Sequence, residues 1–437
     1  MTQTGQVSDR AAASCGAVLI GLLALTPVVG WLGPLAFAPV MALAGLLTLK
    51  WARVDEVDRP AAFAVIVILL WAVGSSVWSP HQPEDLESST ALKLVLQVPT
   101  YWAAIYAVRI ASPKSRRLAL QILAWGTALF GLIMVAEATT GAGIYRFGRV
   151  LLGTEAIRPD LAMKNVAQSG FVLTLLAPAA ILAGAQIGLR YWLALPIGAG
   201  IVVSSLAFGS DAPLIAVVFA GLAALATWRS PIWAPRVMGG VVAFLFLAAP
   251  GILWITRHLG LFDALKAAVS LSWSQRMGYW SHAADWISDH PLRGWGLDAS
   301  RSFSPGIRLH PHDAALQIWL ELGLIGAMAA AVFWAVVLGG QSAPDRSPVR
   351  SVRVATAVIY LTFAAVSFGV WQEWWLAVGA LAATACALTG PLRQASPATS
   401  PSGGELGTAI APPLGELSAK LTEGVRETPV DARAQCE

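Results

Sequence analysis

The chain has 437 residues, of which 56% are hydrophobic and only 12% are charged, and its mean hydropathy is +0.65. A soluble domain usually carries about 25% charged residues, so this composition excludes an ordinary soluble protein. The net charge of +4 comes from lysines and arginines scattered between apolar runs, which argues against a nucleic-acid partner. Three cysteines in separate segments predict no disulfide framework. The composition therefore predicts a polytopic membrane protein.

Apolar runs recur along the chain, and many approach the roughly 20 residues that a helix needs to cross a bilayer. The first run follows Arg10, and because a second follows directly, we expect an uncleaved span rather than a signal peptide. Tryptophans at the ends of runs, such as Trp371 and Trp375, are expected to anchor the membrane interfaces. We predict about twelve spans. They lie near residues 13–30, 33–49, 61–78, 90–108, 118–139, 165–186, 192–207, 213–228, 237–256, 314–338, 354–370 and 376–391.

Lysine and arginine gather in alternate loops. By the positive-inside rule the basic loops lie in the cytoplasm, so both termini are expected there, in agreement with an even number of spans. The segment 392–437 is rich in Pro, Ser, Gly and Ala and is predicted to be a disordered cytoplasmic tail behind a bundle formed by residues 1–391. The basic loops are 50–59, 109–117, 229–236 and 341–353, and the loops without Lys or Arg are 79–89, 208–212 and 371–375.

Two outer segments break this charge rule, because 140–164 and the long loop 257–313 both carry several basic residues. Long loops are translocated regardless of their charge, which is one explanation. The explanation that we favour is a site for an anion on the outer face. The candidate ligands are Arg146, Arg149 and Arg158 in the first segment, and Arg276, Arg293 and Arg308 in the second.

The long outer loop contains a stretch with helical spacing, from about residue 271 to residue 289. Apolar residues repeat every seven positions along it, and polar residues occupy the opposite face. This pattern predicts an amphipathic helix on the outer membrane surface, a prediction compatible with an ordinary helix that caps the bundle. Pro291, Gly294 and Gly296 predict the end of the helix and a turn. The apolar set is Trp273, Trp280 and Ile287, and the polar set is Gln275, His282, Asp285 and Asp289.

The stretch "RLHPHDAALQIWLELGLIG" (308–326) places polar side chains directly before and inside an apolar run. Asp313 is a candidate helix N-cap, and Gln317 and Glu321 follow at intervals of four, which puts all three on one helix face. A charged side chain that faces lipid costs at least about 2.5–3.5 kcal/mol, so Glu321 is expected to face the bundle interior or a water-filled cavity.

His310 and His312 flank Pro311 in the same stretch. A histidine is often a structural hydrogen-bonding residue, and His-x-His without cysteine or a clear carboxylate partner is a weak metal signature. His312 is favoured as a catalyst because it stands at the outer start of a span, near several arginines. We therefore predict a site without metal or other cofactor.

Three stretches resemble the O-antigen ligase and Wzy polymerase superfamily. They are His312–Asp313 followed after nine residues by Gly323-Leu-Ile-Gly326, the segment "RMGYWSHAADWISDHPLRGWGLDASRSF" (276–303), and, more weakly, "RPDLAMKNVAQSG" (158–170). The resemblance implies an all-helical, GT-C-like fold with its active site facing the periplasm, and the count of about twelve transmembrane helices and the large outer loop also match the family. It also implies transfer of a glycan from undecaprenyl diphosphate to an acceptor.

The resemblance assigns roles to two residues. Arg276 would bind the donor diphosphate, and His312 would act as the base or orient the acceptor. Two positions depart from the family pattern, because Asp313 follows the histidine and Asp211 stands where an arginine is expected. Asp313 either raises the basicity of the imidazole or caps the helix. A second diphosphate ligand would come from elsewhere, with Arg146, Arg149 and Arg158 as candidates, and Arg293, Arg308, His310, Asp313 and Glu321 complete the predicted substrate-binding set.

The sequence thus predicts a multi-pass protein of the bacterial inner membrane that acts as a metal-independent, inverting glycosyltransferase. A Wzy-type polymerase of O-antigen or exopolysaccharide is favoured, and an O-antigen ligase that transfers glycan to lipid A–core is the alternative. A twelve-span transporter or flippase is a second alternative, which should show paired halves and charges at the membrane midplane. The expected partners are the lipid-linked donor, the glycan or lipid A–core acceptor, membrane lipid and other polysaccharide-assembly membrane proteins.

Overall fold

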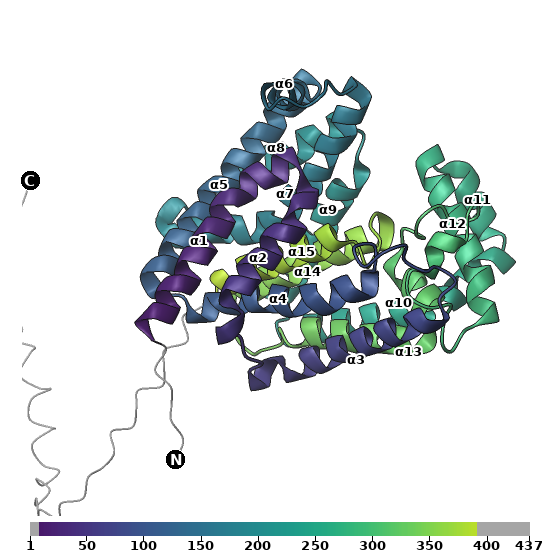
Figure 1. Cartoon of the computed structure of the whole chain (residues 1–437). Coiled ribbons are helices and arrows are strands. Elements are labelled where there is room, and N and C mark those ends of the chain that lie inside the picture. The colour runs from purple at the N-terminus through teal and green to yellow at the C-terminus, as the bar shows by residue number, and fades with distance from the viewer. Residues whose placement is uncertain (1–7, 391–437) are drawn as a thin grey trace, which may run out of the picture. The chain divides into compact units, whose positions relative to one another are not determined.

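The computed structural model describes residues 8–390, and this part of the chain is helical, with no strand (Figure 1). The predicted tail 392–437 lies outside the described residues. The α-helices are α1 (Asp9–Leu32), α2 (Phe37–Thr48), α3 (Arg59–Ser75), α4 (Thr90–Ile110), α5 (Pro113–Thr140), α6 (Gly143–Leu151), α7 (Pro159–Gly184), α8 (Ala194–Ala207), α9 (Asp211–Arg229), α10 (Trp233–His258), α11 (Leu261–Ala268), α12 (Leu271–Asp289), α13 (Ala314–Gly339), α14 (Pro348–Val366) and α15 (Glu373–Leu388). Short 3₁₀ turns occupy Pro34–Ala36, Leu49–Trp51, Glu56–Asp58, Ser76–Trp78 and Ala299–Ser302, and a π-helical turn occupies Ala185–Leu189.

Each of the twelve predicted spans coincides with a helix of the structure. By length and composition, 10 helices of the described chain can cross a membrane, and the two shorter apolar helices are α8 and α15. A helix of 14 residues is about 21 Å long, which is less than the roughly 30 Å of a bilayer core. The prediction of an all-helical, polytopic membrane protein is confirmed.

The basic loops meet at one end of the bundle. Arg109 at the end of α4 forms ion pairs with Asp55 (2.7 Å) and Asp58 in the preceding loop. The guanidinium of Arg116, at the start of α5, donates to the carbonyl oxygen of Gly390 (2.9 Å), and the Ser342 hydroxyl donates to that of Ile232 (2.6 Å). These contacts join loop 50–59 to loop 109–117, and loop 229–236 to loop 341–353.

Small residues let several neighbouring helices approach closely. A Cβ atom added to Gly45 of α2 would collide with the carbonyl group of Thr100 in α4. Gly131 of α5 and Gly200 of α8 face each other in the same way, because a side chain on either would overlap the backbone of the other helix. Membrane helices gain no hydrophobic driving force from association in lipid, so such close backbone packing is a main source of their stability.

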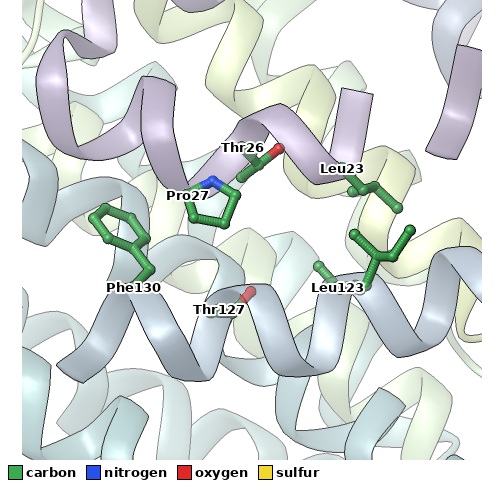
Figure 2. A pocket seen from close by; sticks show the side chains of 7 residues that line it. Leu23, Thr26, Pro27, Leu123, Thr127 and Phe130 are labelled. Carbon is green, nitrogen blue, oxygen red and sulfur yellow. The ribbon is translucent and has the colours of Figure 1, made fainter. Parts of the chain in front are cut away.

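Helix α1 packs on α5 through side chains that surround Pro27 of α1. Figure 2 shows Pro27 of α1 facing Thr127 and Phe130 of α5. Pro27 has no N–H to donate, and the hydroxyl of Thr26 donates to the carbonyl oxygen of Leu22 (2.9 Å) in the same turn. The space between these side chains does not admit a water-sized molecule. This cavity is therefore a feature of helix packing and offers no room for a ligand.

The span predicted as one helix from residue 314 to residue 338 is broken inside the bundle. Gly323 has φ 64° and ψ −160°, so the α-helical hydrogen-bond ladder of α13 is interrupted there. The prediction of a continuous span was wrong at this point. The sequence signal for the break was Gly323 itself, because a backbone with positive φ favours glycine.

The outer loop satisfies the backbone groups that the break releases. The N–H groups of Trp295 and Gly296 donate to the carbonyl oxygens of Leu320 (2.9 Å) and Glu321 (2.8 Å). The indole N–H of Trp71 donates to the carbonyl oxygen of Leu322 (2.8 Å). Irregular backbone at membrane depth is tolerated only where it is buried in protein and its polar groups are paired, and both conditions hold here.

Replacement of Gly323 by alanine is expected to destabilise the protein. The new Cβ would collide with the carbonyl group of Leu292, and the left-handed backbone is itself unfavourable for alanine. Backbone strain of about 1–2 kcal/mol and overpacking of about 1–3 kcal/mol should lower the thermal midpoint of the detergent-solubilised protein markedly. Gly339→Ala in the same helix is the matched control, because nothing lies within 4 Å of its added Cβ. Equal midpoints for the two variants would contradict the proposed role of the break.

Candidate active site

The predicted amphipathic helix is α12. Of its predicted apolar set, Ile287 is buried, whereas Trp273 and Trp280 are half-buried. Met277, Ala283 and Ile287 are buried against the bundle, where α12 contacts α10 and α13. Gln275, His282, Asp285 and Asp289 are exposed, as predicted. In Figure 1, α11 and α12 cover the ends of α10 and α13. The apolar face of α12 therefore packs on protein.

The buried carboxylate of Glu321 joins three separate segments. Its side chain is 0% exposed and accepts four hydrogen bonds. The donors are the hydroxyl of Ser300 (2.7 Å), the amide of Gln317 (3.1 Å), the backbone N–H of Asp298 (3.1 Å) and the indole N–H of Trp371 (2.5 Å). Glu321 thus faces the bundle interior, as predicted, and it is inaccessible to a substrate in this structure. Trp371 and Trp375, expected at the membrane interface, are buried, so the prediction that they anchor the interface was wrong.

Asp313 and Gln317 lie on the same face of α13 as Glu321, nearer the start of the helix. The Asp313 carboxylate accepts from the backbone N–H of Leu316 (2.8 Å), which confirms the predicted N-cap. The carbonyl oxygen of the Gln317 side chain accepts from the N–H of Val370 (3.0 Å). Burial raises the pKa of Asp313 to about 6, and the backbone N–H groups of Leu316 and Ala315 oppose that rise. Of the two alternatives for Asp313, the structure supports the helix cap.

His312 holds a conformation that is rare for a residue with a side chain. Its φ is 60°, in the left-handed region, and such strain is often concentrated at functional sites. Its ring lies against that of Tyr279 from α12, with 6.0 Å between centroids and an interplanar angle of 23°. Its Nδ1 lies 2.7 Å from the carbonyl oxygen of Ser367. Because a carbonyl oxygen only accepts, Nδ1 donates, and the lone pair of the neutral ring resides on Nε2.

The surroundings keep the imidazole of His312 neutral. Burial is the largest cause of the decrease in its pKa, the bond to Ser367 opposes the decrease, and the positive charge of Arg276 adds to it. The pKa therefore lies below the ordinary value of 6.5. At neutral pH the ring is unprotonated and able to accept a proton at Nε2.

The side chain of His310 positions His312 through a hydrogen bond with its backbone. Its side chain is 5% exposed, and its Nδ1 accepts from the backbone N–H of His312 (3.2 Å). Its Nε2 therefore carries the proton and lies 3.3 Å from the side-chain amide of Gln372. The atom of Gln372 that faces Nε2 is the amide nitrogen, and the amide oxygen is buried without a partner, so exchanging the two amide atoms would let Nε2–H donate to the oxygen. Burial, followed by the charges of His312 and Arg301, lowers the pKa of His310 to about 3, so this ring stays neutral.

Arg276 lies one turn before Tyr279 on α12. Burial lowers the pKa of its guanidinium from the usual value, and the carboxylate of Asp211, the first residue of α9, opposes that effect. The guanidinium packs over the ring of Trp273, 5.1 Å from its centroid. Within residues 8–390 it forms no ion pair or hydrogen bond, so its donors are free for an anion. Asp211, found where an arginine was expected, is instead an electrostatic neighbour of Arg276.

The other predicted substrate ligands are spread over two regions. Arg293 and Arg308 are exposed on the same outer loop as the site, and Arg293 lies over the ring of Trp78 (5.9 Å). Arg146 and Arg149 belong to α6, which packs on α5 and α7 and lies well away from α12 in Figure 1. Arg158, at the start of α7, forms an ion pair with Asp160 (2.8 Å). The structure thus brings together Arg276, His310, His312, Asp313 and Glu321, and it does not bring the arginines of α6 to them.

Four partners of the site were absent from the predictions. Tyr279 follows Arg276 by three residues, so helical spacing could have indicated it. Ser367, Trp371 and Gln372 lie in the α14–α15 loop, more than fifty residues from His312 in the sequence. No local pattern connects that loop to the site. Among residues 8–390, no group of three or more His, Cys, Asp or Glu side chains could hold a metal ion.

Known proteins are similar to this chain over the region that contains the site. Residues 196–331 match the O-antigen ligase family model. This part of the chain is therefore similar to the O-antigen ligase family, the resemblance that the sequence analysis indicated. A protein of Rickettsia conorii named "Putative polysaccharide ligase" is 28% identical over 126 residues, which is 26% of this chain and 31% of the relative. A relative of the same name from Rickettsia bellii is 29% identical over 173 residues, 35% of this chain and 40% of its own length.

The matched part thus spans about a third of the length of these relatives. The residues matched by the family model, 196–331, comprise most of α8, all of α9 to α12 and the greater part of α13, and so both Arg276 and His312. The α14–α15 loop, which supplies Ser367 and Gln372 to the histidines, lies beyond them.

Removal of the Glu321 carboxylate is expected to destabilise the site. Glu321→Ala would leave buried donors on Ser300, Gln317 and Trp371 without a partner, at about 1–3 kcal/mol for each. The thermal midpoint of the purified variant should fall sharply. Glu56→Ala is the control, because Glu56 forms an exposed ion pair with Arg59 (3.3 Å) that contributes about 1 kcal/mol or less. A Glu321→Ala protein as stable as this control would show that the four hydrogen bonds are dispensable.

Proposed function

We propose that this protein is a membrane glycosyltransferase that moves a glycan from a lipid diphosphate donor to an acceptor hydroxyl. The observation that carries the proposal is the pairing of two groups at one end of the bundle. His312 offers an unprotonated Nε2, and Arg276, whose charge acts on that ring, offers an unpaired guanidinium. A base next to a phosphate-binding cation is the combination that this reaction requires.

The reaction follows from the two groups. Nε2 of His312 accepts the proton of the acceptor hydroxyl as its oxygen attacks the anomeric carbon of the donor sugar. The new C–O bond forms while the bond between the anomeric carbon and the phosphate oxygen breaks. The lipid diphosphate leaves with the bonding electron pair, and one direct displacement inverts the anomeric configuration.

Arg276 acts on the leaving group. A diphosphate is already a stable anion, so it needs charge stabilisation more than protonation. A guanidinium stays charged and binds two phosphate oxygens at once. Preorganised cations at developing negative charge are often the largest catalytic contribution. This scheme uses no metal ion, in keeping with the expectation from the sequence.

The donor class and the orientation complete the proposal. The similarity to the O-antigen ligase family supports a lipid-linked glycan donor, for which we propose undecaprenyl diphosphate. The many apolar helices support a multi-pass membrane protein, which we assign to the bacterial inner membrane. We propose that both termini are cytoplasmic and that α12 and His312 lie on the periplasmic side, and the basic loops at one end support this orientation. A glycan or lipid A–core acceptor and membrane lipid are the partners that this arrangement would contact, alongside other polysaccharide-assembly proteins.

Two acceptors distinguish the candidate activities. With a second lipid-linked repeat unit as acceptor, the protein is a Wzy-type polymerase of O-antigen or exopolysaccharide, which the sequence favours because no fixed acceptor is evident in it. With lipid A–core as acceptor, it is an O-antigen ligase, and the names of the matched family and relatives favour this second candidate. The two are separated by supplying purified protein in vesicles with an undecaprenyl diphosphate-linked glycan and each acceptor in turn. Glycolipid translocation without any transfer would instead support a flippase.

His312→Ala should reduce glycan transfer by about 10²–10⁴, the usual contribution of a general base, and Arg276→Ala should abolish it or nearly so. Transfer is measured in the vesicle assay at equal amounts of membrane protein. His258→Ala and Arg229→Ala are the matched controls and should retain full activity, because both side chains are exposed and neither forms a hydrogen bond, ion pair or ring contact with Arg276 or His312. Full turnover by His312→Ala would exclude a role as base.

The pH profile should also report the coupling between the two residues. Burial and the charge of Arg276 lower the pKa of His312. The value of kcat/KM should therefore fall only at a pH below the ordinary histidine pKa of about 6.5. In Arg276→Gln the removed positive charge no longer disfavours the imidazolium. The acid limb of the residual activity should then move to higher pH. An unchanged limb in Arg276→Gln would contradict the electrostatic coupling.

A further inference from the structure

A second cavity of about 390 Å³ lies on the outer loop, beside α12, and no step of the reaction above uses it. Its volume is within the range of about 300–1,000 Å³ typical of small-ligand sites. It is formed where the C-terminal half of α12 meets the loop at residues 302–306. The lining residues are His282, Trp286, Ser302, Phe303, Ser304, Pro305 and Gly306.

The walls of this cavity combine aromatic faces with unpaired polar groups. The rings of Trp286 and Phe303 are stacked, with centroids 4.1 Å apart and an interplanar angle of 22°, and the ring of His282 lies 5.9 Å from that of Trp286. Within the described chain, the side chains of His282, Ser302 and Ser304 form no hydrogen bond to other protein groups. A pyranose ring has an apolar C–H face and a rim of hydroxyl groups. Aromatic rings beside hydroxyl and imidazole groups match both.

The cavity is held open by the surrounding loop. The indole N–H of Trp295 donates to the carbonyl oxygen of Trp286 (2.8 Å), and the ring of Trp295 packs edge-on against Phe303. The N–H of Ile307 donates to the carbonyl oxygen of Phe303 (2.8 Å), which closes the loop. At Gly306 an added Cβ would come within 2.9 Å of the Trp286 ring and 3.3 Å of the His282 ring. Glycine at this position therefore leaves the space free.

The order of residues along α12 relates the cavity to the reacting groups. Arg276 comes first, Tyr279 with His312 against its ring comes next, and His282 and Trp286 follow. His282 is about 4.5 Å of helix rise beyond Tyr279, and Arg276 is about the same distance before it. Along the axis of α12, Tyr279, whose ring lies against that of His312, is therefore between Arg276 and His282.

We infer that this cavity binds a sugar ring of the acceptor glycan. The inference rests on the proposed function, because it takes Arg276 as the leaving-group side and His312 as the base. In an in-line displacement the attacking hydroxyl approaches the anomeric carbon from the side opposite the leaving diphosphate. The acceptor must then extend away from Arg276, past His312, and this direction leads along α12 to His282 and Trp286.

Two variants test the cavity directly. Gly306→Val fills it, and His282→Ala removes an exposed side chain with no structural hydrogen bond. Binding is measured by saturation-transfer NMR on the full chain in detergent, with the oligosaccharide repeat released by mild acid from the host's surface polysaccharide as the probe. In both variants the Kd for the oligosaccharide should rise about tenfold or more, as expected when one good contact is lost. Trp192→Ala, an exposed tryptophan between α7 and α8, is the control and should bind as the unaltered protein does.

The transfer assay separates acceptor from donor. In Gly306→Val and His282→Ala the KM for the acceptor should rise about tenfold, while the KM for the lipid-linked donor and the thermal midpoint of His282→Ala stay unchanged. An increase in the donor KM instead would overturn the inference, and so would unaltered oligosaccharide binding by both variants. His312→Ala should bind the oligosaccharide normally. Failure of the proposed function would therefore appear as absent transfer, whereas failure of this inference would appear in the binding measurement.

Discussion

The break in α13 and the buried carboxylate beside it are the features on which the outer half of the molecule depends. A helix that is interrupted at Gly323 exposes carbonyl groups that lipid cannot satisfy, so protein must supply the missing donors. The turn at Trp295 and Gly296 supplies two of them from its backbone. Glu321, two residues before the break, accepts from that same loop and from Trp371. A buried carboxylate is tolerated only when its oxygens are so fully hydrogen-bonded.

This arrangement fixes the position of the candidate base. The loop that is held by Glu321 continues to His310 and His312, and the N-cap at Asp313 sets where α13 begins. The α14–α15 loop, joined to Gln317 and Glu321, presents the carbonyl oxygen of Ser367 to Nδ1 of His312. His312 is therefore oriented by segments on both sides, and its left-handed backbone is maintained by these contacts. Orientation through Nδ1 leaves Nε2 available, which is the property that a general base needs.

The site and the aromatic cavity together suggest how one helix can organise a transfer reaction. Along α12 a cation, the ring that packs on the base, and an aromatic cavity follow one another in the order in which a leaving group, a reacting hydroxyl and an acceptor chain would lie. The buried face of α12 packs on α10 and α13, so this order is held rigidly against the bundle. Sites built on packed helices position their groups more accurately than sites on free loops.

The sequence by itself determined the elements whose signal is local. Twelve apolar runs correspond to helices, the two faces of α12 follow from its periodicity, and Asp313 is the N-cap because a carboxylate precedes an apolar run. Gln317 and Glu321 were correctly placed on an inward face, since a charge that faces lipid is costly. Only the tertiary structure decided which distant groups meet. The break at Gly323, the burial of Trp371, the contact of Ser367 with His312 and the separation of α6 from α12 depend on packing between segments far apart in the chain, and residue spacing carries no information about such contacts.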